Sequence, residues 1–332
     1  MTVITLLLCI LGPTAVGKTE IAIAVAQKLD AEIVSTDSRQ IYRYMNIGTA
    51  KPSSSEQAQV RHHLIDCVTP DEHFSAADYQ RAADSAIQDI QSRGKQAILV
   101  GGTGLYFRAV VDGLFDGPDA DPDFRAKLMA EAYKFGAEVL HSRLLQVDPK
   151  SASRIHPNDL IRVIRALEVY EKTGKTISEL QKEWHRASPR YLFVAFGINR
   201  ERQELYHRIE ERVDKMLAGG LLEEVKSLIA QGYDENLPAM KGFGYKELID
   251  YLNGKYEFTN ARSGLMDWDT AVDLLKRNTR RFAKRQLTWF RNDPRIKWIN
   301  LSEIDFNSAV QLILQDFARN RFDTTDRIDG RG

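Results

Sequence analysis

Residues 12–19 have the types and spacing of a phosphate-binding loop. Gly12 and Gly17 enclose four residues, and Lys18 and Thr19 follow directly. The glycines allow backbone amides to turn toward one anion, the lysine adds a full charge, and the hydroxyl can ligate a Mg²⁺ ion that bridges phosphates. The expected loop residues are Gly12, Thr14, Ala15, Gly17, Lys18 and Thr19, with Thr19 as the metal ligand. The loop alone does not identify its phosphate, because nucleotides and other diphosphates present similar oxygens.

The segments on either side of this loop support the interpretation. Residues 2–11 form an apolar, β-prone run, and residues 21–29 have a helical pattern. A strand before the loop and a helix after it are the context in which this motif binds phosphate. A second strand is expected at residues 32–36, and it ends in Asp37.

Asp37 follows a strand at the edge where open parallel sheets bind their ligands. A carboxylate there can hold magnesium-bound water or act as a general base. It can equally cap a turn or a helix, a common use of Asp. The residues alone leave these alternatives open.

A second glycine-rich turn follows the strand expected at residues 96–100. It contains Gly101, Gly102, Thr103 and Gly104. Such a turn lets a substrate approach the backbone, with the Thr103 hydroxyl available to it, although tight helix–strand packing also uses glycine. The nearby phosphate loop favours substrate contact. His62 and His63 are adjacent on a strand and point to opposite faces, so we expect a structural role rather than a shared metal site.

Composition limits the class of protein. The chain has 332 residues, enough for about two domains, and its 46 basic residues equal its 46 acidic ones. Any nucleic-acid surface must therefore be local. Two cysteines far apart in sequence, Cys9 and Cys67, fit a reducing cytoplasm, and no apolar run approaches the length of a membrane span.

The order of the expected elements predicts an α/β protein with a P-loop NTPase-like parallel sheet flanked by helices and a mostly helical insertion. Residues 112–122 are dense in Gly, Pro and Asp, which is typical of a boundary. No convincing strand follows until residues 191–196. We therefore expect a core domain of residues 1–115 and 190–320, a helical insertion of residues 116–189, and a polar tail of residues 321–332.

Three expected helices carry basic residues that can face a phosphate or solvent. Arg162 and Arg165 share a face of a helix at residues 159–172, and Arg208 and Arg212 lie one turn apart in a long helix at residues 202–230. The third helix, at residues 276–291, interleaves basic residues with aromatic ones. This composition suits RNA, with the charges toward the nucleic acid and the rings mostly inward.

Taken together and in order, the motifs resemble those of the tRNA dimethylallyltransferases, also called tRNA isopentenyltransferases. The resemblance covers nearly the whole chain and is carried by residues 12–19, 37–52, 62–66, 101–106, 158–168, 219–225 and 283–291. It implies transfer of a dimethylallyl group from dimethylallyl diphosphate to N6 of the adenosine just 3′ of the anticodon. The phosphate loop then holds the donor's diphosphate with Mg²⁺.

The resemblance also implies roles for individual residues. Asp37 is the base, Thr103 lies by the substrates, and Arg212 neutralises the diphosphate, although Arg208 lies one turn away. The implied tRNA contacts are Asp37, Ser38, Arg39, Gln40, Thr103, Arg125, Ile161, Arg162, Val163, Ile164, Arg165, Gly242, Phe243, Gly244, Tyr245, Lys246, Glu247, Arg280, Arg281 and Lys284. Many family members carry another residue in place of Phe243.

The implied partner is the anticodon stem-loop of tRNA, and the implied enzyme is a cytoplasmic monomer of the bacterial, zinc-free type. Three other functions use a similar phosphate loop: an adenylate isopentenyltransferase, an ATP-dependent small-molecule kinase, and a non-catalytic RNA-binding NTPase switch. The helical insertion and the basic helix favour tRNA as the acceptor, because a free nucleotide needs no such reach.

Overall fold

The computed structural model describes residues 6–115, 117–184, 189–254 and 266–328, so residues 2–5 of the first predicted strand and residues 329–332 of the tail lie outside the description. The chain divides into two compact units, residues 1–111 with 190–332 and residues 112–189. The sequence predicts this boundary after residue 115, whereas the structure has it after residue 111. Phe115 belongs to the second unit, where the Arg165 guanidinium lies over its ring at 5.9 Å from the centroid.

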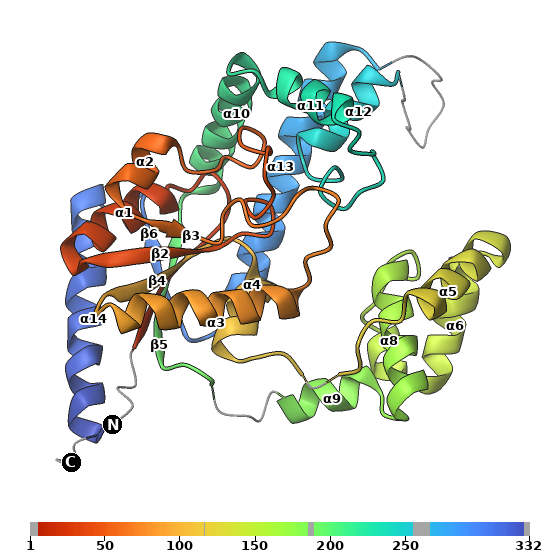
Figure 1. Ribbon diagram of the computed structural model, residues 1–332, viewed down its shortest axis with the longest axis horizontal. Helices are drawn as coiled ribbons and strands as arrows, with labels where there is room; N and C mark the ends of the chain where they lie inside the picture. Colours follow the sequence, from red (N-terminus) through yellow and green to blue (C-terminus); the bar gives the residue numbers. More distant parts are fainter. Residues whose placement is uncertain (1–5, 116, 185–188, 255–265, 329–332) are drawn as a thin grey trace. The chain divides into compact units, whose positions relative to one another are not determined.

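A parallel six-stranded sheet forms the centre of the larger unit (Figure 1). Its order is β3-β2-β4-β1-β5-β6. The strands are β1 (Leu7–Leu11), β2 (Ala31–Thr36), β3 (His62–His63), β4 (Gln96–Gly101), β5 (Phe193–Asn199) and β6 (Ile296–Asn300). Leu11 and Thr36 both pair with Gly101, so β1, β2 and β4 end level with one another. The three segments predicted to carry chemistry therefore leave the sheet at one edge.

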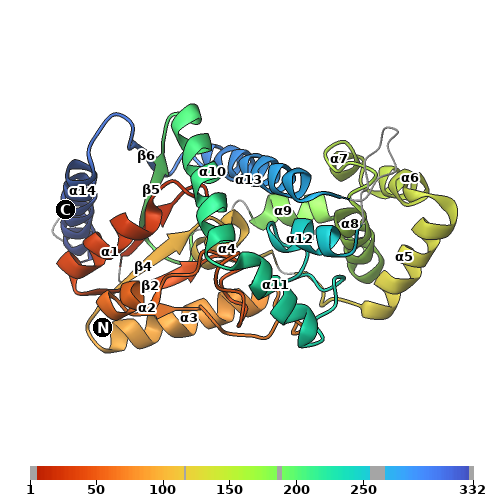
Figure 2. The same ribbon diagram turned by 90° about the horizontal axis from the view of Figure 1, so that it is seen from above.

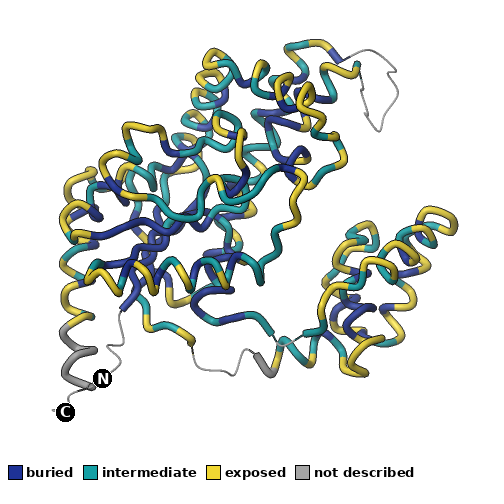
Figure 3. Tube along the Cα trace, viewed as in Figure 1, coloured by how far each residue is buried: buried dark blue, intermediate teal, exposed yellow. Residues whose placement is uncertain are grey.

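Helices cover both faces of this sheet. Alternate residues of β1 pack on one side against α1 (Lys18–Leu29) and α14 (Phe306–Ile328), and on the other against α3 (Ala76–Ser92) and α4 (Gly104–Val111). Burial on both faces explains why the central strand β1 is apolar throughout rather than alternating, and Figure 3 shows the middle of the sheet as buried.

The remaining helices of the larger unit are α2 (Ser54–Gln59), α10 (Arg202–Ala218), α11 (Leu221–Ala230), α12 (Tyr245–Leu252) and α13 (Trp268–Arg291). Ser53 and Glu56 form a capping box at the start of α2. The prediction of one continuous helix at residues 202–230 is wrong. Gly220 adopts a left-handed conformation, with φ of 97°, which ends α10 and starts α11 in a new direction.

Helices α3 and α14 pack on opposite faces of the sheet. On α3 the buried side chains are Tyr79, Ala83, Ile87 and Ile90, and Ala86 packs partly buried against the same apolar core. Helix α14 continues to Ile328, so residues 321–328 of the predicted polar tail are helical.

The second unit is helical over its described residues, as predicted. It contains α5 (Pro122–Phe135), α6 (Ala137–Val147), α7 (Pro149–Ala152), α8 (Leu160–Thr173) and α9 (Ile177–Trp184), drawn in yellow and green in Figure 2. Its apolar core is built mainly from α5, α6 and α8. In neither unit does a helix of the described chain combine the length and apolar character needed to cross a membrane.

The Tyr79 hydroxyl links α3 to the end of β2. It donates to the Ser35 carbonyl at 3.0 Å and contacts the Thr36 hydroxyl at 3.1 Å, in a fully buried position. We expect Tyr79→Phe to lower the free energy of unfolding by about 1–2 kcal/mol, because buried partners lose a hydrogen bond. Chemical denaturation measures the change. Tyr44→Phe, at a half-exposed ring, is the control, and equal stability of the two variants would contradict the assignment.

Candidate active site

The phosphate loop connects β1 to the N-terminus of α1. Gly17, with φ of 103°, is the N-cap of that helix. Gly12 has φ of 150°, and a Cβ there would lie 2.5 Å from the Ile198 carbonyl oxygen. Only glycine fits this position without a clash. The predicted loop is thus present, with the helix N-terminus behind it as an anion site.

Lys18 is the charged group of the loop. Its Nζ donates to the Pro13 carbonyl at 2.6 Å. Burial lowers the pKa of Lys18 to about 7, although the negative charge of Asp37 opposes that shift, and Arg212 adds to it. A diphosphate would supply the anion that this buried ammonium lacks.

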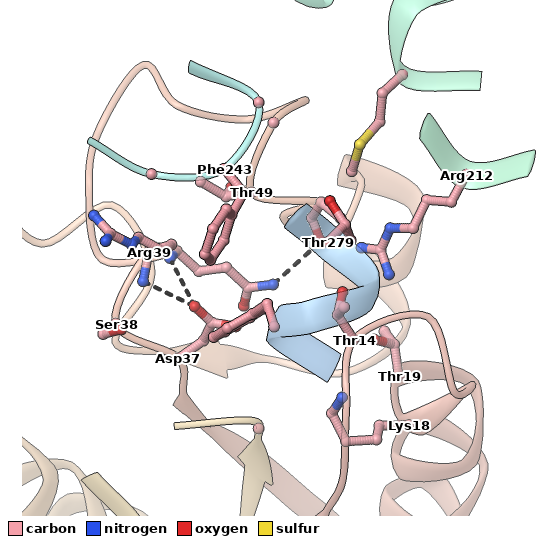
Figure 4. A pocket seen from close by; sticks show the side chains of 18 of the residues that line it. Thr14, Lys18, Thr19, Asp37, Ser38, Arg39, Thr49, Arg212, Phe243 and Thr279 are labelled. Carbon is pink, nitrogen blue, oxygen red and sulfur yellow. Dashed lines mark hydrogen bonds between the residues drawn. The ribbon is translucent and has the colours of Figure 1, made fainter. Parts of the chain in front are cut away.

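The loop forms one end of a pocket (Figure 4). Lys18, Thr19 and Arg212 lie on one side of the view, and Asp37, Ser38 and Arg39 lie on the other. The apolar residues of the wall come from α1, α10, α11, α13, two strands and the loop before α12. They are Ala22, Ile33, Val100, Ile209, Val213, Met216, Leu221, Phe243, Leu275 and Phe282. The pocket therefore combines a cationic end, a carboxylate and an apolar wall.

Asp37 serves the backbone as well as the pocket. Its Oδ1 accepts hydrogen bonds from the amides of Arg39 at 2.8 Å and Gln40 at 3.4 Å. The Arg39 side chain donates to the Pro238 carbonyl at 2.7 Å. Asp37 therefore caps a turn and also lines the pocket at the edge of the sheet, so the two interpretations that the sequence left open are compatible.

Thr103 holds the turn that carries Asp37. Its Oγ1 accepts from the Ser38 amide at 3.0 Å and donates to the Ser38 hydroxyl at 3.3 Å. A Cβ on Gly101 would lie 2.1 Å from the Thr36 carbonyl oxygen. The start of the second glycine-rich turn is thus tightly packed against the neighbouring strand β2, and direct substrate contact by Thr103 stays a prediction.

Arg208 and Arg212 occupy different positions although they lie one turn apart on α10. Arg208 donates from Nε to the Ala15 carbonyl at 3.0 Å, which supports the phosphate loop from outside. Arg212 lines the pocket with Lys18 and Asp37, and burial lowers the pKa of its guanidinium. A second pocket, beside Lys18 and Thr19, is lined by both arginines, so both lie next to the phosphate loop and Arg212 also reaches the pocket that contains Asp37.

Gln286 and His62 are among the wall residues that were not predicted for the site. Gln286 is buried on α13, where Oε1 accepts from the Thr14 amide and Nε2 donates to the Gly102 carbonyl, both at 2.9 Å. It joins the two glycine-rich loops. The i, i+4 spacing of Phe282 and Gln286 was the available signal. His62 also lines the pocket, whereas His63 points away and contacts Glu32 at 2.7 Å.

The loop before α12 contributes to the pocket, but not every residue predicted to contact tRNA is accessible. Gly242, Phe243, Gly244 and Tyr245 line the pocket. Tyr245 is 1% exposed, and Glu247 is buried with its carboxylate on the Gly244 amide at 2.8 Å. The prediction that these two side chains contact tRNA is corrected, because both support the loop from inside. Lys246 is exposed.

The basic helix α13 presents only part of its charge to solvent. Arg281 and Lys284 are exposed. Arg280 instead bonds to Glu210 at 2.5 Å and lies over the Tyr206 ring at 5.9 Å, so its guanidinium is engaged with α10. Phe290 is buried, in agreement with the expectation that the rings point inward.

In the second unit the predicted tRNA contacts also divide by exposure. The side chains of Ile161 and Arg162 are 78% and 75% exposed, but Val163 and Ile164 belong to the helical core. We correct the prediction for Val163 and Ile164, since buried side chains cannot reach an external RNA.

Arg125 and Arg165 of the second unit share one fully buried carboxylate. Arg125 donates to Glu168 through Nε at 2.8 Å and Nη2 at 2.7 Å, and Arg165 donates through Nη1 at 2.5 Å. The two guanidiniums lower the pKa of Glu168 to about 2, against the opposing effect of its burial. Both arginines are therefore held in fixed orientations.

The described residues contain no group of three His, Cys, Asp or Glu side chains that could hold a metal ion. A Mg²⁺ ion on a phosphate substrate needs only one or two protein oxygens, because the phosphates and water supply the others. The Thr19 hydroxyl at the pocket end fits that requirement.

A sequence model described as IPP transferase matches residues 40–293. The chain is 51% identical to "tRNA dimethylallyltransferase 2" of Geotalea daltonii, over 88% of this chain and 87% of that protein. It is 50% identical to the tRNA dimethylallyltransferase of Geobacter sulfurreducens, over 94% and 97%.

Solved structures agree with these sequence matches. The tRNA isopentenylpyrophosphate transferase of Bacillus halodurans aligns over 98% of this chain and 99% of its own, with a TM-score of 0.71 and 40% identity. A eukaryotic dimethylallyltransferase acting on tRNA aligns over 95% and 80%, with a TM-score of 0.76 and 28% identity. The chain belongs to the IPP transferase family, together with the tRNA dimethylallyltransferases.

Proposed function

We propose that this enzyme transfers a dimethylallyl group from dimethylallyl diphosphate to N6 of the adenosine just 3′ of the anticodon in tRNA. The observation that carries the proposal is the pocket itself, in which the phosphate loop faces an apolar wall and a carboxylate. A short isoprenoid diphosphate has the same division into charged and apolar ends. The names of the relatives support tRNA as the acceptor.

The cationic end stabilises the leaving group. Lys18, Arg212 and the loop amides surround the position where the diphosphate gains negative charge, and they are fixed before reaction. A Mg²⁺ ion on Thr19 would neutralise further phosphate charge. The apolar wall holds the prenyl group and keeps water from the reactive carbon.

The transfer forms one C–N bond, breaks one C–O bond and releases one proton. N6 attacks C1 of the prenyl group, the C1–O bond breaks, and its electron pair leaves with the diphosphate. The Asp37 carboxylate takes the proton from N6. An aromatic amine is a poor nucleophile, so a base that accepts this proton lowers the barrier.

The acceptor adenosine must leave its stack to reach the pocket, which is the usual arrangement for chemistry on a base. We assign the contacts with tRNA to exposed residues of each unit. These are Arg281 and Lys284 in the larger unit and Ile161 and Arg162 in the smaller one. The enzyme would act as a monomer in the cytoplasm, where tRNA is available.

The direct test incubates the protein with unmodified tRNA, magnesium and dimethylallyl diphosphate, without ATP. Digestion and mass spectrometry then detect N6-dimethylallyladenosine. ATP consumption without this product would support a kinase or an NTPase switch. Prenylation of free adenylate alone would support an adenylate isopentenyltransferase.

Asp37→Asn separates the two roles of Asp37. The amide oxygen can still accept from the Arg39 amide, but it cannot take up a proton at neutral pH. We expect kcat to fall by about 10²–10⁴-fold, while tRNA affinity stays unchanged. Single-turnover kinetics with a filter-binding control measure both. Full activity of Asp37→Asn would exclude Asp37 as the base.

Arg212→Gln removes the charge that shares the pocket with Lys18. We expect the KM for dimethylallyl diphosphate to rise about 10–100-fold, the effect of losing a charge-assisted hydrogen bond. Arg202→Gln, at an exposed arginine of the same helix, is the matched control. A similar KM in both variants would show that Arg212 does not contact the donor.

The depressed pKa of Lys18 predicts a pH-dependent affinity. Above pH 7 the free enzyme holds this lysine largely neutral, whereas a bound diphosphate favours the charged form and raises its pKa. Donor binding at pH 8 should therefore take up a proton, and affinity should fall by up to about tenfold per pH unit above 7.

Calorimetry in buffers of different ionisation enthalpy measures this proton uptake. Lys18→Arg is the control, because arginine stays charged throughout the range and takes up no proton. Equal affinity of the unaltered protein at pH 7 and pH 9 would contradict the prediction.

A further inference from the structure

Glu224, in the first turn of α11, accepts four hydrogen bonds from outside its own helix. Oε2 accepts from the amides of Asn46 at 2.9 Å and Ile47 at 2.8 Å. Oε1 accepts from the Gly48 amide at 3.1 Å and from the Tyr245 hydroxyl at 2.6 Å. A carboxylate has about four acceptor positions, so this one is saturated.

The segment held by Glu224 is a compact loop, residues 46–51. Lys51 closes it, since its Nζ donates to the Tyr42 carbonyl and the Asn46 side chain, both at 2.8 Å. Gly48 lies against the Tyr245 ring, where a Cβ would come within 2.6 Å of ring carbons. The loop therefore packs against the buried Tyr245 ring, whose hydroxyl donates to Glu224.

This loop is part of the pocket. Gly48, Thr49 and Ala50 line it. The Ala50 carbonyl accepts from Gln40 Nε2 at 3.1 Å, and Gln40 Oε1 accepts from the Ser35 hydroxyl at 3.0 Å. A continuous series of contacts therefore runs from Glu224 through the loop to Gln40, which belongs to the turn capped by Asp37.

We propose that Glu224 is a positioning residue for the reaction. Its carboxylate fixes residues 46–51 as a wall of the pocket and, through Ala50, sets the orientation of Gln40 beside the Asp37 turn. This inference rests on the proposed function for its kinetic consequence, but the fixing of the loop stands apart from it.

The test compares Glu224→Gln with Glu223→Gln. Glu223 is the preceding residue, and its side chain is 69% exposed. In Glu224→Gln an amide NH₂ replaces one acceptor oxygen and faces backbone N–H donors, so at least one hydrogen bond to the loop is lost. Tyr245→Phe removes a single bond to Glu224 and leaves the ring in place.

Hydrogen exchange followed by mass spectrometry gives the first measurement. We expect peptides that cover residues 46–51 to exchange at least about tenfold faster in Glu224→Gln, with a smaller change in Tyr245→Phe and none in Glu223→Gln. Unchanged exchange in Glu224→Gln would overturn the proposal. Faster exchange across the whole larger unit would also overturn it, because the role of Glu224 would then be general stability.

The second measurement is enzyme kinetics, made below the unfolding temperature of every variant. We expect kcat with tRNA and saturating dimethylallyl diphosphate to fall roughly tenfold in Glu224→Gln and to be unchanged in Glu223→Gln. An unchanged kcat beside a loosened loop would overturn the catalytic part. If the unaltered protein makes no prenylated tRNA while the exchange results hold, the proposed function fails and the loop assignment stands.

Discussion

The phosphate loop must keep its amides and a buried ammonium directed at an anion before that anion binds. Four contacts hold it in this form: Ile198 against Gly12, Gln286 on the Thr14 amide, Arg208 on the Ala15 carbonyl, and Arg200 on the Val16 carbonyl. They come from β5, α13, α10 and the segment between β5 and α10. A local motif thus depends on elements that follow it by almost 200 residues or more, and disturbance of their packing alters the anion site.

Local sequence patterns identified the motifs of the candidate site, but not the distant residues that hold those motifs in position. The phosphate loop, Asp37 and the second glycine-rich turn were found from sequence, because each motif follows a parallel strand and such strands end at one edge. Gln286 and Glu224 were missed as site residues. Their partners lie 272 and about 177 positions away in sequence, and no periodicity encodes that pairing.

Sequence periodicity also indicates which face of a helix a residue is on, but not where the helix ends or what the side chain contacts. The apolar spacing of Leu217, Leu221 and Val225 continues across Gly219 and Gly220, so a helix that ends there looks continuous in sequence. Arg208 and Arg212 share a helical face and both line a pocket beside the phosphate loop, yet of the two it is Arg212 that also lines the pocket containing Asp37. Only the packing of α10 against the loop distinguishes the two arginines.

The double use of Asp37 is compatible with catalysis. Its Oδ1 accepts the backbone amides that form the turn, and the second oxygen of the carboxyl group can take a proton while those bonds persist. A carboxylate is a weak base, but the amine becomes acidic as the new C–N bond forms, so a weak base in a fixed position is sufficient. The same turn is tied to Thr103 through Ser38 and to the loop at residues 46–51 through Gln40. The position of this carboxylate is therefore set by both sides of the pocket, and in the proposed reaction a shift of either side would move it away from N6.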